Sequence, residues 1–202
     1  MQDGMTWLLN SPEQSLAFVL ADSGFDVWVA NTRGTRSSLS HVSLSSSDPG
    51  TLIALATLSE GREVEKLRSA ALLCPVAYLD HMKTPLGILA ARIFLAFRDG
   101  VLRKYDYGSG GANTKKYGQH TPPLYNLSNI PNSLPMYLSY GGRDSLSDTK
   151  DVGHLLEDLK LHDSDKLSVH YVENYAHADF VMGITAKQMV YDSMTAFFRN
   201  QH

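Results

Sequence analysis

The feature that most constrains the fold is an alternation of strand-like runs with segments of helical period. Residues 70–76 form a continuous apolar run suited to a strand covered on both faces, and residues 134–139 and 167–172 are predicted as further strands. A helix predicted to begin at Asp148 lies between the last two, with apolar residues at i, i+3, i+4 and i+7 spacing. This order favours an α/β fold with a mostly parallel sheet, helices on its faces and right-handed connections.

The first half of the chain predicts a fourth strand. A helix should start at the capping box in residues 11–14 and end at Gly24, directly before a strand at residues 25–30. The apolar, alanine-rich residues 51–59 should be helical. We hypothesise that strand 25–30, this helix and strand 70–76 form a direct right-handed βαβ unit, which gives a sheet of about four strands.

The remaining segments predict loops and two further helices. Residues 37–49 are rich in serine and have no apolar period, so a loop is expected, and residues 105–123 should form a long Gly-, Tyr- and Pro-rich loop. Residues 85–97 indicate an apolar helix, and a capping box of Thr185 and Gln188 should start the last helix. The length of 202 residues fits a single domain, 1–202.

Composition excludes several classes of function. A net charge of −3 argues against binding to nucleic acid, which requires clustered Lys and Arg. No apolar stretch reaches the roughly 18 residues of a transmembrane helix. Cys74 is the single cysteine, so an internal disulfide and a cysteine-based zinc site are excluded, and a buried structural thiol is expected. No cofactor and no metal ligand is predicted.

Two polar residues follow neighbouring predicted strands. Asp144 comes after residues 134–139, and His177 comes after residues 167–172. Ligands of parallel sheets bind at the carboxyl ends of the strands, so both residues should lie at one edge, where an Asp can orient a His base. A turn Asp and an incidental loop His are the alternative for each alone. Their order, strand–Asp–helix–strand–His–helix, favours a catalytic pair.

Six segments spread over nearly the whole chain carry a resemblance to the acid lipase family of α/β hydrolases, in particular to its plant triacylglycerol lipase 2-like members. In that family the Asp of a Gly-Gly-x-Asp run and the His of a His-x-Asp-Phe run belong to a Ser-His-Asp triad. The resemblance therefore implies that Asp144 is the acid and His177 the base of a triacylglycerol or sterol ester hydrolase. The matching segments are residues 15–22, 24–34, 104–108, 122–127, 141–144 and 177–180.

The nucleophile of such a triad is missing from the sequence. No G-x-S-x-G elbow occurs, although the run from Gly50 reads like the helix that should follow one. If Gly50 is the last glycine of the elbow, Asp48 stands at the nucleophile position. Pro49, which has no backbone N–H, then stands where an oxyanion donor should be. Asp48 as a nucleophile is an unlikely alternative, because a turn Asp before proline is the common arrangement.

Other parts of the family pattern are also expected to be lacking. The resemblance places an oxyanion loop before Met1, an elbow strand between Gly34 and Gly50, and a long lipid-covering cap where residues 95–98 join directly. We therefore predict an incomplete α/β-hydrolase fold with a reduced cap. Residues 78–125 should be the remnant of the cap and its connecting loop.

These gaps predict little or no esterase activity for this chain. The alternative is a non-catalytic protein that binds lipid or a partner, and the candidate contacts are Leu86, Ile88, Leu89 and Phe94. Asn126 begins a glycosylation sequon that matters only on the secretory route. The first residues show no secretory signal, whereas family members are usually secreted, lysosomal or vacuolar, so localisation and oligomeric state are left open.

Overall fold

The computed structural model describes residues 4–30, 50–81 and 101–201. Its centre is a parallel sheet of three strands in the order β1-β2-β3. The strands are β1 (Ala70–Leu73), β2 (Met136–Gly141) and β3 (Leu167–Val172). The α/β class and the parallel sheet predicted from the sequence are therefore confirmed. The helical segments are η1 (Gly4–Leu8), α1 (Leu16–Asp22), α2 (Gly50–Ser59), η2 (Val64–Lys66), α4 (Gly110–Tyr117), η3 (Leu127–Asn129), α5 (Thr149–Asp158), α6 (Asp179–Met182), η4 (Lys187–Tyr191) and α7 (Asp192–Arg199).

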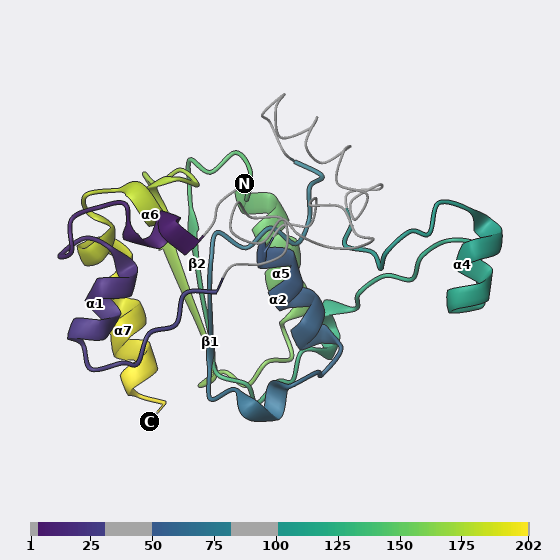
Figure 1. The fold of residues 1–202 in the computed structure, drawn as a ribbon, viewed down its shortest axis with the longest axis horizontal. Helices are drawn as coiled ribbons and strands as arrows, with labels where there is room; N and C mark the ends of the chain where they lie inside the picture. Colours follow the sequence, from purple (N-terminus) through teal and green to yellow (C-terminus); the bar gives the residue numbers. More distant parts are fainter. Residues whose placement is uncertain (1–3, 31–49, 82–100, 202) are drawn as a thin grey trace.

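Helices cover both faces of the sheet (Figure 1). Successive side chains of a strand point to opposite faces, so β2 contributes to two cores. Met136 and Leu138 pack in one core together with Leu55 of α2 and Leu155 of α5. Tyr137 points the other way and packs against Met194 and Phe197 of α7. In Figure 1, α2 and α5 accordingly lie on one side of the strands, and α1 and α7 lie on the other.

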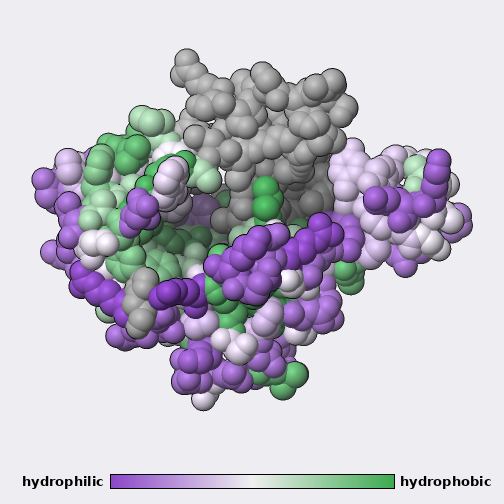
Figure 2. Space-filling view, turned by 60° about the horizontal axis from the view of Figure 1, so that its bottom comes forward, coloured by the Kyte–Doolittle hydropathy of each residue, from purple (hydrophilic) through white to green (hydrophobic). Residues whose placement is uncertain are grey.

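Residues 25–30 form no strand, so the predicted fourth strand and the βαβ unit built on it are wrong. The segment has a strand-like composition, but within the described residues it makes no strand pairing, and β1 stays at the edge of the sheet. Phe25 instead packs edge-on against Phe198 of α7, with ring centroids 6.1 Å apart. The side chain of Trp28 is 87% exposed. Figure 2 shows apolar surface gathered on the side of the molecule that carries α1 and α7.

Two predicted helix starts moved because the hydroxyl groups found other partners. Helix α1 begins at Leu16 rather than within residues 11–14, and the hydroxyl of Ser15 donates to the Asn10 carbonyl (2.9 Å). At the C-terminus, the Thr185 hydroxyl shares a 2.6 Å hydrogen bond with Tyr175, and the π-helix η4 precedes α7. By contrast, Asp148 caps α5 as predicted, because its carboxylate accepts from the Lys150 N–H (3.0 Å).

The predicted loop at residues 105–123 contains helix α4. The Ser109 hydroxyl accepts from the Ala112 N–H, and Gly118 ends the helix at a φ of +76°. Asn113 is buried and donates to both Asp106 and the His120 carbonyl. These polar contacts hold the segment although it projects from the rest of the molecule (Figure 1). The predicted loop at residues 37–49 and helix at residues 85–97 lie outside the described residues, as do Asp48 and the candidate lipid contacts Leu86, Ile88, Leu89 and Phe94.

Two glycines at the end of β2 allow the loop after β3 to approach closely. A Cβ atom on Gly141 would collide with the Tyr175 carbonyl oxygen, and one on Gly142 would collide with the Glu173 carbonyl oxygen. The Arg143 N–H donates to that same Tyr175 oxygen at 3.0 Å. The loops after β2 and β3 are therefore in backbone contact. In the described part of the chain, no helix is long and apolar enough to cross a membrane.

We expect Gly141→Ala to destabilise the protein by about 2 kcal/mol or more, because the new methyl group meets backbone that cannot rotate away. Gly153→Ala is the matched control: Gly153 lies within α5 and nothing surrounds its Cβ position. It should stabilise the protein by roughly 0.5–1 kcal/mol through helix propensity. Urea unfolding of both variants measures this difference. Equal effects of the two substitutions would contradict the close approach.

Candidate functional site

The carboxylate of Asp144 is fixed in the loop directly after β2. The Asp144 side chain is fully buried, and its Oδ1 accepts hydrogen bonds from the backbone N–H groups of Leu146 and Ser147, both at 2.8 Å. The Ser147 hydroxyl donates to the Pro75 carbonyl at 2.6 Å, which ties this loop to the segment after β1. The second carboxylate oxygen, Oδ2, lies 2.8 Å from Nδ1 of His177.

The surroundings of Asp144 keep its carboxylate charged. Burial opposes ionisation, but the hydrogen bond and charge of His177 and the two backbone N–H donors outweigh it, so the pKa of Asp144 is lowered from its ordinary value. A charged, acceptor-only carboxylate beside Nδ1 favours the tautomer that carries its proton on Nδ1. The other ring nitrogen, Nε2, is then the one available to accept a proton.

His177 sits on the loop between β3 and the short helix α6. The Ala176 N–H donates to the Asp179 carboxylate at 2.7 Å, and the buried ring of Phe180 packs edge-on against Tyr175 (ring centroids 5.3 Å apart). These contacts fix the loop on both sides of the histidine. The His177 side chain itself is 33% exposed, so its ring can be reached from solvent.

Cys74 joins this pair, which sequence reasoning missed. It directly follows β1 and adopts a φ of +50°. Ligand atoms of Cys74, Asp144 and His177 lie within 4.8 Å of one another. The thiol is buried as predicted, and its Sγ donates to the His177 carbonyl at 3.8 Å. The signal was present: residue 74 ends a strand at the same sheet edge as the other two.

The chemical character of Cys74 differs from that of a reactive cysteine. Burial raises the pKa of its thiol strongly, and the neighbouring Asp144 carboxylate raises it further. Nucleophilic attack requires the thiolate. The Cys74 thiol is therefore protonated at neutral pH and acts as a packing group beside the Asp144–His177 pair.

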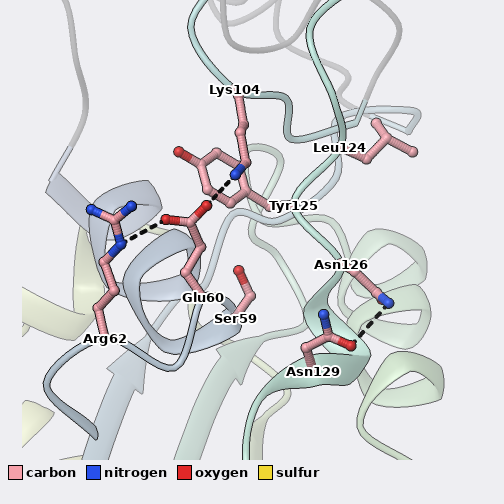
Figure 3. A pocket seen from close by; sticks show the side chains of 8 residues that line it. All are labelled: Ser59, Glu60, Arg62, Lys104, Leu124, Tyr125, Asn126 and Asn129. Atoms are coloured by element: carbon pink, nitrogen blue, oxygen red, sulfur yellow. Dashed lines mark hydrogen bonds and ion pairs between the residues drawn. The ribbon is translucent and has the colours of Figure 1, made fainter. Parts of the chain in front are cut away.

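A separate pocket of about 410 Å³ lies between the end of α2 and the segment around η3 (Figure 3). In it, the Glu60 carboxylate pairs with Lys104 and with Arg62, whose Nε is 3.0 Å away. The ammonium group of Lys104 also lies 5.6 Å from the centre of the Tyr125 ring. The two cations are thus balanced by one carboxylate, and none of Cys74, Asp144 and His177 lines this pocket.

The sequon residue Asn126 lies at the rim of the same pocket. Its side-chain oxygen accepts from the Ser128 N–H at 3.2 Å and thereby caps η3, and its amide nitrogen donates to the side chain of Asn129. Asn126 is exposed. Asp48 and Pro49, the residues expected at the nucleophile and oxyanion positions, lie outside the described residues.

No protein-family model matches the chain. Among solved structures, an esterase of Pyrococcus furiosus superposes with a TM-score of 0.46 at 18% sequence identity, covering 75% of this chain and 49% of the esterase. That likeness is too distant to indicate a function.

Curated relatives give a clear answer about family. The chain is 36% identical to triacylglycerol lipase 2 of Arabidopsis thaliana over 310 aligned positions, which cover 98% of this chain and 74% of the relative. It is 32% identical to triacylglycerol lipase 1 of the same plant, covering 97% of this chain and 77% of the relative. Human gastric triacylglycerol lipase matches at 33% identity over 59% of this chain and 29% of the relative. The chain therefore belongs to the acid lipase family of α/β hydrolases, together with the plant triacylglycerol lipases.

Proposed function

We propose that this chain is a shortened triacylglycerol lipase homologue that keeps the acid and base of a hydrolase but has little or no ester hydrolase activity of its own. The observation that carries the proposal is the 2.8 Å hydrogen bond between His177 Nδ1 and the buried Asp144 carboxylate. The substrate class of the parent activity is long-chain esters of the triacylglycerol or sterol ester type. Its support is the names of the curated relatives and the family resemblance.

The pair is suited to general base catalysis. His177 would take the proton of an attacking hydroxyl at Nε2, while Asp144 orients the ring and stabilises the imidazolium that forms. Both side chains come from the carboxyl ends of adjacent strands, where parallel sheets place their reactive groups. The geometry therefore supports the roles that the family pattern assigns to Asp144 and His177.

The missing part is the group that His177 should activate. The sequence contains no G-x-S-x-G elbow, and the residues before Gly50 offer an aspartate and a proline instead. Without the serine there is no acyl-enzyme intermediate. Loss of a single oxyanion N–H costs about 3–4 kcal/mol of transition-state stabilisation, and Pro49 supplies no N–H. Ester hydrolysis should accordingly fall to background.

Two observations support an internally shortened chain. The alignment with the plant lipase is 310 positions long whereas the chain has 202 residues, so more than one hundred positions of that relative have no counterpart here. The described parts of residues 78–125 also run back along themselves, because Tyr78 bridges Val101 and Arg103 bridges Leu124 in antiparallel fashion. We infer that residues 78–125 are a reduced cap and connecting loop.

We predict that the purified full chain hydrolyses p-nitrophenyl butyrate and p-nitrophenyl decanoate no faster than buffer does, because no nucleophile faces His177. The His177→Ala variant should give the same rate, and the Arabidopsis relative serves as the positive control. Turnover that disappears in His177→Ala would contradict the proposal. If that turnover also disappeared in Cys74→Ala, the nucleophile would be the thiol.

A second prediction concerns the stability of the pair. A carboxyl with a lowered pKa stabilises the fold at pH values above its ordinary pKa, and this stabilisation is lost as the pH falls through the lowered folded-state value. We expect Asp144→Asn to lower the free energy of unfolding by about 1–2 kcal/mol at pH 7 and by much less near pH 2.5. Urea unfolding at both pH values measures the difference.

The control for this titration is Asp163→Asn, which changes an exposed carboxylate. Its effect should stay within about 0.5 kcal/mol at both pH values. A pH-independent cost of Asp144→Asn would show that the carboxylate contributes only as a hydrogen-bond acceptor, and the proposed charged pair would then be wrong.

A further inference from the structure

A second group of polar side chains lies between helix α5 and the segment after β1. Asp151 and His154 are three residues apart on α5 and therefore project from the same face of the helix. Asp80 reaches this face from the segment that follows β1. One ligand atom from each of Asp80, Asp151 and His154 lies within 4.8 Å of the others.

Two of the three side chains are already held in place. The Asp151 carboxylate is 2% exposed, and His81 donates to it twice, from ring Nδ1 at 2.7 Å and from its backbone N–H at 3.1 Å. The His154 ring packs edge-on against Tyr78 and His81, with centroids 5.7 Å and 5.8 Å apart. Asp80 and His154 are nevertheless exposed, so a solvated ion can reach them.

We propose that Asp80, Asp151 and His154 bind a zinc ion. One imidazole and two carboxylates are a common donor set for Zn²⁺, whereas Mg²⁺ and Ca²⁺ take oxygen ligands only. Zinc bonds of about 2.0–2.2 Å place tetrahedral donors roughly 3.3–3.5 Å apart. Rotation of the exposed Asp80 side chain can close the remaining distance.

The charges and the neighbouring histidine fit this assignment. Two carboxylates converge on the site, and a divalent cation offsets their mutual repulsion. The double hydrogen bond from His81 fixes the Asp151 carboxylate and leaves lone pairs on both oxygens, because a carboxylate accepts about four hydrogen bonds. Three protein ligands leave the fourth position to water. Bound zinc would fasten the segment after β1 to α5.

The test is a calorimetric titration of the metal-free full chain with zinc chloride, followed by magnesium chloride, at pH 7.5. We expect one zinc per chain, no comparable heat from magnesium, and binding weakened at least tenfold in Asp80→Asn and in His154→Gln. Both substituted side chains are exposed, so the fold should tolerate the changes. Zinc at saturation should also raise the unfolding temperature of the parent chain by several degrees, but not that of Asp80→Asn.

Two control variants make the result specific. His120→Gln changes an exposed histidine near α4 and should leave zinc affinity unchanged. Cys74→Ala removes a ligand from the other group of potential metal ligands found in the described residues, Cys74, Asp144 and His177, and should also leave it unchanged. The proposal is overturned if zinc does not bind, if Asp80→Asn and His154→Gln bind it as tightly as the parent, or if only Cys74→Ala loses it.

Discussion

The buried carboxylate of Asp144 is the group on which the loops after all three strands depend. It accepts from two backbone N–H groups of its own loop and pairs with His177 from the loop after β3. The Ser147 hydroxyl, two bonds away in this network, holds the segment after β1 through the Pro75 carbonyl. A buried charge is costly unless its partners are in place, so these contacts constrain one another. The geometry at this sheet edge is therefore set by structure as much as by chemistry.

This dependence explains how a hydrolase-like pair can persist without a nucleophile. Asp144 and His177 belong to the packing of the sheet edge, together with Gly141, whose missing side chain admits the Tyr175 carbonyl. The elbow strand of the family pattern, by contrast, would lie beyond β1, which is an edge strand among the described residues. Its loss opens the side of the sheet where residues 25–30 now run unpaired and leaves the three remaining strands in register.

Sequence reasoning succeeded where local pattern and long-range packing agree. The span of β3 and the cap of α5 at Asp148 were both predicted, because period and capping chemistry are properties of neighbouring residues. The strand at residues 25–30 failed because strand formation requires a partner, which composition does not reveal. The position of Cys74 beside Asp144 and His177 depends on three strand ends meeting, and the convergence of Asp80 on α5 depends on a connection whose path no local pattern fixes.

The central claim is that Asp144 and His177 form a competent acid–base pair that lacks only a serine in front of it. Its most direct test is a chain into which the elbow segment of the Arabidopsis relative, with its Gly-x-Ser-x-Gly serine, is inserted before Gly50. Mass spectrometry after reaction with a fluorophosphonate probe then reports serine activation. We predict that the inserted serine is labelled, and that His177→Ala and Asp144→Asn slow the labelling by roughly a hundredfold or more. Labelling at the same rate in the His177→Ala chain would contradict the claim.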